Sequence, residues 1–160
     1  MLEFCQWLDQ TAVGSTIRQS LWLFPAIETL HLLGMAALVG TITVLDLRLL
    51  GWVMPERRVS QMAASLLPWA WLGFGAQAVT GVLLFSSEAV KIYGNPAFRL
   101  KMLFLLLAGI QALLFQTVVS SKLSTWDDRP ALPVAAKVMG LISILLWVAI
   151  VTAGRFIGFV

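Results

Sequence analysis

Charged residues are scarce in this sequence. Asp, Glu, Lys and Arg make up only 12% of the 160 residues, which is about half the share of an ordinary soluble domain. A soluble catalytic domain is therefore not expected. The formal net charge of +3 comes mostly from basic residues beside apolar segments, as is common in membrane proteins, and it does not indicate nucleic-acid binding.

Cysteine is almost absent, since Cys5 is the only one. A single thiol cannot form a disulfide within the chain, and there is no Cys-x-x-Cys-His motif, which excludes covalent attachment of a c-type haem. We interpret Cys5 as a packing residue. Residues 1–10 carry Glu3 and Asp9 and lack a basic segment, so we expect no cleaved signal peptide there.

Catalytic motifs are also lacking. The sequence contains no glycine-rich phosphate loop, no internal repeat and no nucleophile paired with a general base, so hydrolase chemistry is not expected. No catalytic residue is identified, and it stays open whether the chain is an enzyme. A membrane oxidoreductase or electron-transfer protein is the class that the other features allow.

Apolar residues are abundant instead. They make up 59% of the chain, and the mean hydropathy is +0.89. A membrane-spanning helix needs roughly 20 residues, and four apolar segments qualify, at about 21–50, 63–85, 96–120 and 134–159. We predict an all-α integral membrane four-helix bundle, a single domain over residues 1–160. Asn95 and Pro96 are typical of the cap and first position of a helix.

The N-terminal segment differs from the four long ones. Residues 1–10 alternate apolar with polar side chains, a pattern typical of a short amphipathic helix in the membrane interface. Gly14 and Ser15 are expected to break this helix, with Ser15 capping the next one. Four spans place both termini on one side, and Arg57 with Arg58 favours the cytoplasm for the first loop. We expect a bacterial inner-membrane protein, in contact with lipid, with periplasmic termini.

The only histidine, His31, lies inside the first span, three residues after Glu28. This spacing brings both side chains toward one face of a helix. Ionisable side chains in a membrane helix are costly to bury, and they usually face the interior and serve a function. Gln77 and Thr80 of the second span are polar at membrane depth, so that face of the second helix should also point inward.

The predicted topology brings carboxylates, cations and one thioether to the side of the membrane on which His31 lies. These are Glu28, Glu88, Arg99, Lys101, Met102 and Arg155. At the opposite end of the first span, we expect Asp46 and Arg48 to form an interfacial ion pair. Asp46 is about 27 Å from Glu28 along the helix, so these two acids cannot share a site.

Three hypotheses for this cluster stay open. In the first, His31 ligates a b-type haem in an electron-transfer protein, and Met102 is a candidate second ligand. Arg99, Lys101 and Arg155 would then bind the haem propionates.

In the second hypothesis, a transition metal binds at His31, Glu28 and Glu88, or copper binds at His31 with Met35 or Met102, or the Glu28–His31 site handles protons, in each case without haem. In the third, Glu28 and His31 only fix helix packing in a structural subunit of a membrane complex. Four short spans with faces of small residues favour a homo-oligomer, and electron transfer would require a redox partner.

Several motifs resemble those of a known family. They are Pro25-x-x-Glu28-x-x-His31-x-x-Gly34, Asp46-Leu47-Arg48-Leu49-Leu50-Gly51, Asn95-Pro96-Ala97-Phe98-Arg99-Leu100-Lys101 and Gly154-Arg155-Phe156-Ile157. Over nearly its whole length the chain resembles a family of uncharacterised bacterial four-helix membrane proteins, named only as a domain of unknown function. In architecture it is loosely similar to CopD-type copper-resistance proteins and to four-helix cytochromes b. The cytochrome b561 pattern has paired histidines on facing helices, which this chain lacks.

Overall fold

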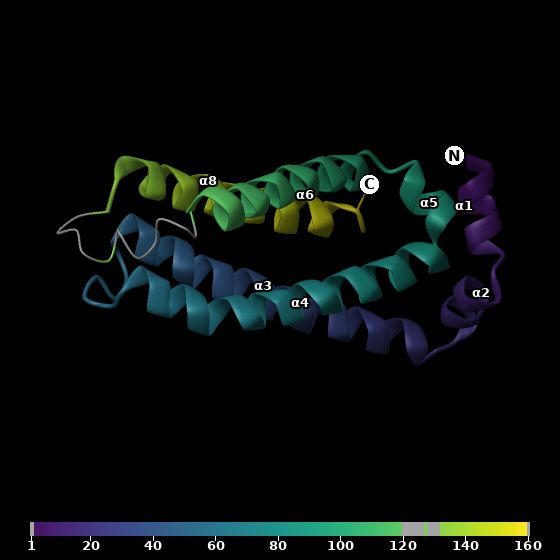
Figure 1. Ribbon diagram of the computed structural model, residues 1–160. Helices are drawn as coiled ribbons and strands as arrows, with labels where there is room; N and C mark the ends of the chain where they lie inside the picture. Colours follow the sequence, from purple (N-terminus) through teal and green to yellow (C-terminus); the bar gives the residue numbers. More distant parts are fainter. Residues whose placement is uncertain (1, 120–126, 128–131, 160) are drawn as a thin grey trace.

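The computed structural model describes residues 2–119, 127 and 132–159, and this part of the chain is helical, without strands (Figure 1). Its helices are α1 (Leu2–Asp9), α2 (Ala12–Gln19), α3 (Leu23–Leu50), α4 (Val59–Ser87), α5 (Ala89–Tyr93), α6 (Pro96–Leu114), the π-helical η1 (Phe115–Val119) and α8 (Val134–Phe156). The all-α prediction is confirmed.

Four of these helices are long and apolar enough to cross a membrane, namely α3, α4, α6 with its extension to Thr117, and α8. Their number and order agree with the predicted spans, and they indicate a multi-pass membrane protein. Most of their apolar side chains face outward; α6, for example, contains no buried residue. Outward apolar side chains suit a protein whose surroundings are lipid.

The observed bounds differ from the predicted ones by a few residues. Helix α4 begins at Val59 instead of residue 63, because Ser60 and Gln61 are helical although they are too polar to belong to an apolar segment. Helix α3 ends at Leu50, as expected, because Gly51 has a φ of 83° and stops the helix. Helix α8 ends at Phe156, not at residue 159. The predicted end of the third span, residue 120, lies outside the described residues.

The N-terminal segment forms two short helices, and the predicted break between them is wrong. Thr11, not Ser15, caps α2, since its side chain accepts a hydrogen bond from the Gly14 amide at 3.2 Å. Gly14 lies within α2 and allows it to approach the end of α4, because a Cβ at Gly14 would lie 2.5 Å from the Ser86 carbonyl oxygen. Close backbone contact, not helix breaking, explains this glycine.

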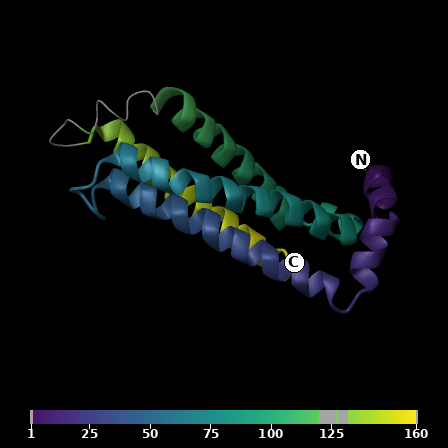
Figure 2. The ribbon, with the colours of Figure 1, turned by 60° about the horizontal axis from the view of Figure 1, so that its bottom comes forward.

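Helices α3 and α8 are the central helices of the bundle. Helix α4 packs along α3, α8 packs on α3, and α6 packs on α8. Helices α4 and α6 meet near the end of α4 and the start of α6, where the Phe85 and Phe98 rings stack at 5.3 Å. Figure 2 shows α6 leaning away from α4 toward η1. The interior is therefore enclosed mainly by α3, α4 and α8.

Glycine allows the backbones of α3 and α4 to approach closely. A Cβ at Gly73 would lie 2.8 Å from the Leu38 amide nitrogen and 2.9 Å from the Gly34 carbonyl oxygen. Small residues at such contacts are typical of membrane helices, because association there depends on close packing instead of the hydrophobic effect. The α3–α4 contact is therefore fixed by Gly34 and Gly73.

The main apolar core lies at the loop end of the bundle, where α3, α4 and α8 meet. Its buried members are Leu45, Leu49, Val59, Met62, Ala63 and Ala136. Arg48 closes this end, since its guanidinium donates to the carbonyl oxygens of Arg57 at 2.6 and 2.8 Å and of Pro55 at 3.0 Å. Asp127 also contacts this end of the bundle, because its carboxylate accepts hydrogen bonds from the hydroxyl and the amide of Ser60 at the start of α4.

The predicted ion pair between Asp46 and Arg48 is wrong. Within the described residues, the ion pairs are Arg18–Asp9 and Lys91–Glu88. Residues two apart on a helix point in nearly opposite directions, and Arg48 bonds the loop carbonyls while Asp46 turns into the bundle. The two charges are therefore separated.

We expect Gly73→Ala to destabilise the protein by about 1–3 kcal/mol, because the new Cβ would collide with the backbone of α3. Gly75→Ala is a matched control on the same helix, since a Cβ at Gly75 meets nothing within 4 Å and alanine favours a helix by about 1 kcal/mol. Thermal unfolding in one detergent measures both variants. Equal melting temperatures would contradict a close contact at Gly73.

Candidate functional site

His31 lies on α3 and faces α4, where its side chain is partly buried. Its Nδ1 is 2.8 Å from the hydroxyl oxygen of Thr80, and its main-chain carbonyl accepts a hydrogen bond from the Gln77 side chain. The absence of a side chain at Gly81 makes room for the ring, since a Cβ there would lie 3.4 Å from Cε1. The predicted inward face of the second span is thus confirmed at Gln77 and Thr80.

The Thr80 hydroxyl determines which nitrogen of His31 carries a proton. A hydroxyl has one proton to donate, and Thr80 donates it to the carbonyl oxygen of Ala76 at 2.5 Å. Thr80 can therefore only accept from His31, so we infer that Nδ1 carries the hydrogen. In the neutral imidazole, Nε2 then keeps its lone pair. Such an arrangement, with Nδ1–H held by an oxygen, is common for histidines that ligate metals through Nε2.

Lys101 is the one predicted cation that turns into the bundle. It lies on α6, is partly buried, and its Nζ lies 3.5 Å from the point that a Cβ at Gly154 of α8 would occupy. Its charge is close enough to interact with the imidazole of His31. Residues from all four long helices therefore form this region, which we call the His31 site: His31, Thr80, Gly81, Lys101 and Gly154.

The start of α6 explains the direction of Lys101. Asn95 caps this helix by accepting from the amides of Ala97 and Phe98, at 2.9 and 3.3 Å, and it also donates to the Ile157 carbonyl beyond α8 at 3.1 Å. The first turn of α6 is thus fixed against the end of α8. The predicted cap at Asn95, with Pro96 as the first helical residue, is confirmed.

The other predicted cation sites lie at the surface. Arg99 is exposed and lies 5.5 Å from the Tyr93 ring centroid, with Nε donating to the Tyr93 carbonyl at 3.3 Å. Arg155 is exposed and lies 5.9 Å from the centroid of the Phe159 ring. Met102, one residue after Lys101, is 49% exposed. The structure does not bring these three side chains to His31.

The acidic residues that were predicted to join His31 are also dispersed. Glu28 is exposed, and Glu88 lies at the end of α4, where it pairs with Lys91 at 3.2 Å. In residues 2–119, 127 and 132–159, no three or more side chains of His, Cys, Asp or Glu come together as metal ligands would. In the described part of the chain, His31, Glu28 and Glu88 therefore do not come together as a metal site.

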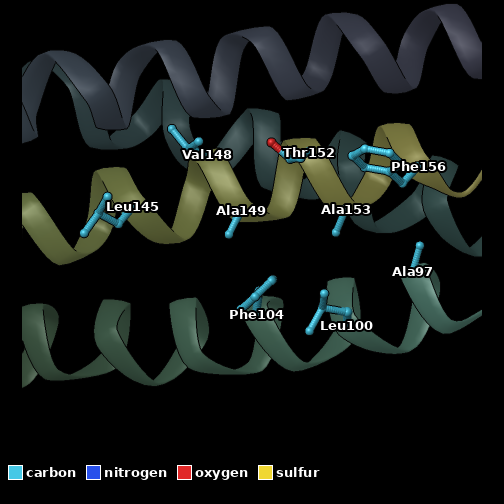
Figure 3. Close-up of a pocket in the computed structure, with 9 residues that line it drawn as sticks. All are labelled: Ala97, Leu100, Phe104, Leu145, Val148, Ala149, Thr152, Ala153 and Phe156. Carbon is cyan, nitrogen blue, oxygen red and sulfur yellow. The ribbon is translucent and has the colours of Figure 1, made fainter.

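A groove with a volume of about 500 Å³ runs between α6 and α8. Figure 3 shows Ala149 and Ala153 of α8 pointing toward α6. Its lining residues are Ala97, Leu100, Phe104, Leu145, Val148, Ala149, Thr152, Ala153 and Phe156. Only Thr152 among them has a polar side chain, so the groove suits an apolar group.

The hydrogen bonds that hold His31 were not predicted. Thr80 and Gln77 were identified as inward-facing residues of the second span, but not as partners of His31. Glu28 was expected beside His31, yet residues three apart on a helix differ by about 60° in direction. That difference leaves His31 against α4 and Glu28 exposed.

Fold and site together define a helical protein with four helices able to cross a membrane and one histidine held between two of them. The chain belongs to the Family of unknown function (DUF6644), whose model matches residues 4–160. The predicted membership of a family of unknown function is thereby confirmed. No curated protein and no solved structure matched the chain in the comparisons.

We expect the His31 imidazole of the metal-free protein to be in the Nδ1–H form. Nitrogen-15 NMR of histidine-labelled protein measures this, and the single histidine needs no assignment. Thr80→Val removes the acceptor, so the Nε2–H form should appear. Thr41→Val is the control, because the Thr41 hydroxyl bonds only carbonyls of its own helix. An Nε2–H wild type would contradict the inferred geometry.

Proposed function

We propose that this protein is a membrane electron-transfer protein in which Nε2 of His31 ligates the iron of a b-type haem. The observation that carries the proposal is the bond between Nδ1 and Thr80, whose own proton goes to Ala76. This leaves Nε2 free as a ligand and fixes the orientation of the ring. When bound, a haem of this kind supplies reversible one-electron chemistry at iron.

Lys101 favours a haem over a bare metal ion at this site. A cationic side chain near the imidazole repels a metal cation, but it forms charge-assisted hydrogen bonds with a carboxylate such as a haem propionate. Glu28 and Glu88, which a bare metal ion would need as further ligands, are dispersed. Arg99 and Arg155 lie at the same end of the bundle as surface cations, where they suit lipid headgroups or a propionate that reaches the surface.

The backbone near the His31 site is compatible with a flat ligand. Gly81 and Gly154 present no side chain toward His31 and Lys101, so α4 and α8 add no side-chain bulk at these two points. The only histidine supplies one strong ligand per chain. A second ligand would come from a weaker donor, such as Met102 across an interface between two copies, or from water.

The cellular setting is part of the same proposal. Helices that can cross a membrane, together with Arg57 and Arg58 in the first loop, favour the inner membrane of a bacterium with the loop in the cytoplasm. The His31 site would then lie near the periplasmic side, and a redox partner would reach it there.

A purely structural role for His31 is the second candidate. The hydrogen bonds from His31 to Thr80 and from Gln77 to the His31 carbonyl tie α3 to α4, as a packing role in a larger membrane complex would require. Binding of copper or a proton at the free Nε2, without haem, is the third possibility. These candidates differ in what the purified protein contains.

We expect protein purified in mild detergent to show a Soret band with stoichiometric iron, and His31→Ala to lose both. Gln111→Leu is the control for general damage, because it removes another interhelical bond, from Gln111 to the Met139 carbonyl at 2.7 Å, and should keep the band. Copper without a Soret band would support the third possibility. A folded, colourless and metal-free wild type would overturn both cofactor proposals.

We expect Lys101→Met to lower the midpoint potential of the bound haem, because a nearby positive charge stabilises the reduced state. The fall should be on the order of 60 mV, which corresponds to a tenfold change in a one-electron equilibrium constant. Arg99→Met is the matched control, since Arg99 lies at the surface on the same helix. Spectroelectrochemistry measures both, and equal potentials would show that Lys101 does not act on the haem.

A further inference from the structure

Asp46 is a buried carboxyl group near the loop end of α3. The residue is only 5% exposed, and its Oδ2 atom is buried without a hydrogen-bond partner. Among the residues that the structure describes, no other buried side-chain nitrogen or oxygen lacks a partner. Asp46 is about 22 Å from His31 along the helix axis, so it belongs to a separate site.

The partners of Asp46 come from α8. A Cβ at Gly140 would lie 2.9 Å from the Asp46 carbonyl oxygen, so the two backbones are in close contact there. Ser143, which is also buried, hydrogen-bonds with the Asp46 carboxyl group. Leu45 and Leu49 of the apolar core flank the residue on α3. The carboxyl group is thus held between two helices by one hydroxyl group.

The nearby cations do not neutralise Asp46. Arg48 on the same helix bonds the carbonyl oxygens of Pro55 and Arg57. Lys137, in the first turns of α8, is exposed, and α4 has no charged residue between Val59 and Ser87. Asp127 is engaged with Ser60. An ionised Asp46 would therefore be a buried charge without a counterion, which is very unfavourable in a membrane protein.

A proton is the ligand that this environment suits best. Calcium is typically bound by about six to eight oxygen ligands and magnesium by about six. The carboxyl group of Asp46 has only the hydroxyl group of Ser143 beside it, which is too few ligands for either ion. Protonation removes the charge and needs no further ligand. It also leaves the unpaired oxygen as a neutral carbonyl oxygen, which is much less costly to bury than a carboxylate oxygen.

We propose that Asp46 is a proton-binding site, which takes a proton from water at the loop side of the membrane and returns it there. A hydronium ion transfers its proton to a carboxylate oxygen of Asp46, so that an O–H bond forms and a water molecule leaves. Ser143 positions the carboxyl group, and the bound proton takes the place of the counterion that the surroundings of Asp46 lack. This site is independent of any cofactor at His31.

Infrared spectroscopy of the full-length protein in lipid tests the proposal. We expect an absorption band of a protonated carboxyl group that is lost in Asp46→Asn and kept in Glu56→Gln, an exposed acid of the first loop. If Asp46→Asn does not fold, Ser143→Ala should still shift the band, because it removes the hydroxyl partner. Absence of the band in the wild type, or its persistence in folded Asp46→Asn, would overturn the proposal.

Transfer to heavy water distinguishes a working proton site from a sealed structural acid. The Asp46 band should shift to its deuterated position well before the amides of the long helices exchange. A shift that only accompanies amide exchange would show that the proton leaves only when the helices open, which overturns exchange with the loop side. Loss of the band on addition of sodium ions would identify a cation site instead.

Discussion

The close contact between α3 and α4 at Gly34 and Gly73 is the constraint on which the site depends. With no Cβ at either glycine, the two backbones approach until a side chain at Gly73 would touch the α3 main chain. His31 lies about one turn from Gly34, and Thr80 lies two turns from Gly73. The short hydrogen bond between them therefore requires the helix separation that the glycines allow.

The same contact explains why polar groups are tolerated within helices that are apolar enough to cross a membrane. In lipid, a polar side chain needs a partner inside the protein. Gln77 and Thr80 find theirs on α3 and on the α4 main chain. The histidine is thereby fixed in one orientation by groups that would otherwise be unpaired, so packing and the proposed ligand chemistry arise from the same hydrogen bonds.

Composition and hydropathy were enough to predict four long helices, their order and the inward face of α4. These features depend on where apolar residues occur along the chain, and the sequence gives those positions directly. Which cation turns inward was not predictable, because Arg99, Lys101 and Arg155 all lie near helix ends at the same side. Their directions depend on the rotation of α6 and α8 about their axes, and tertiary contacts such as Asn95 with Ile157 set that rotation.

Asp46 was misjudged for a related physical reason. A charged pair near the end of a span normally lies at the membrane interface. The positions of Asp46 and Arg48 near the end of the first span were compatible with such a pair. The sequence does not reveal that the loop carbonyls of Pro55 and Arg57 take the guanidinium, which leaves the acid alone. The partner Ser143 is almost a hundred residues away, and only the packing of α8 on α3 brings it there.

The position of α3 between two neighbours accounts for the location of both proposed sites on one helix. A helix packed on a single neighbour can shield one sector from lipid, whereas α3 packs on α4 and on α8 and can shield two. His31 uses the sector facing α4, and Asp46 uses the sector facing α8. Helix α6, which packs mainly on α8, has no buried residue and turns only Lys101 of its two cations inward. Costly polar groups thus concentrate where two neighbouring helices can satisfy them, and this requirement places the chemistry of the chain on α3.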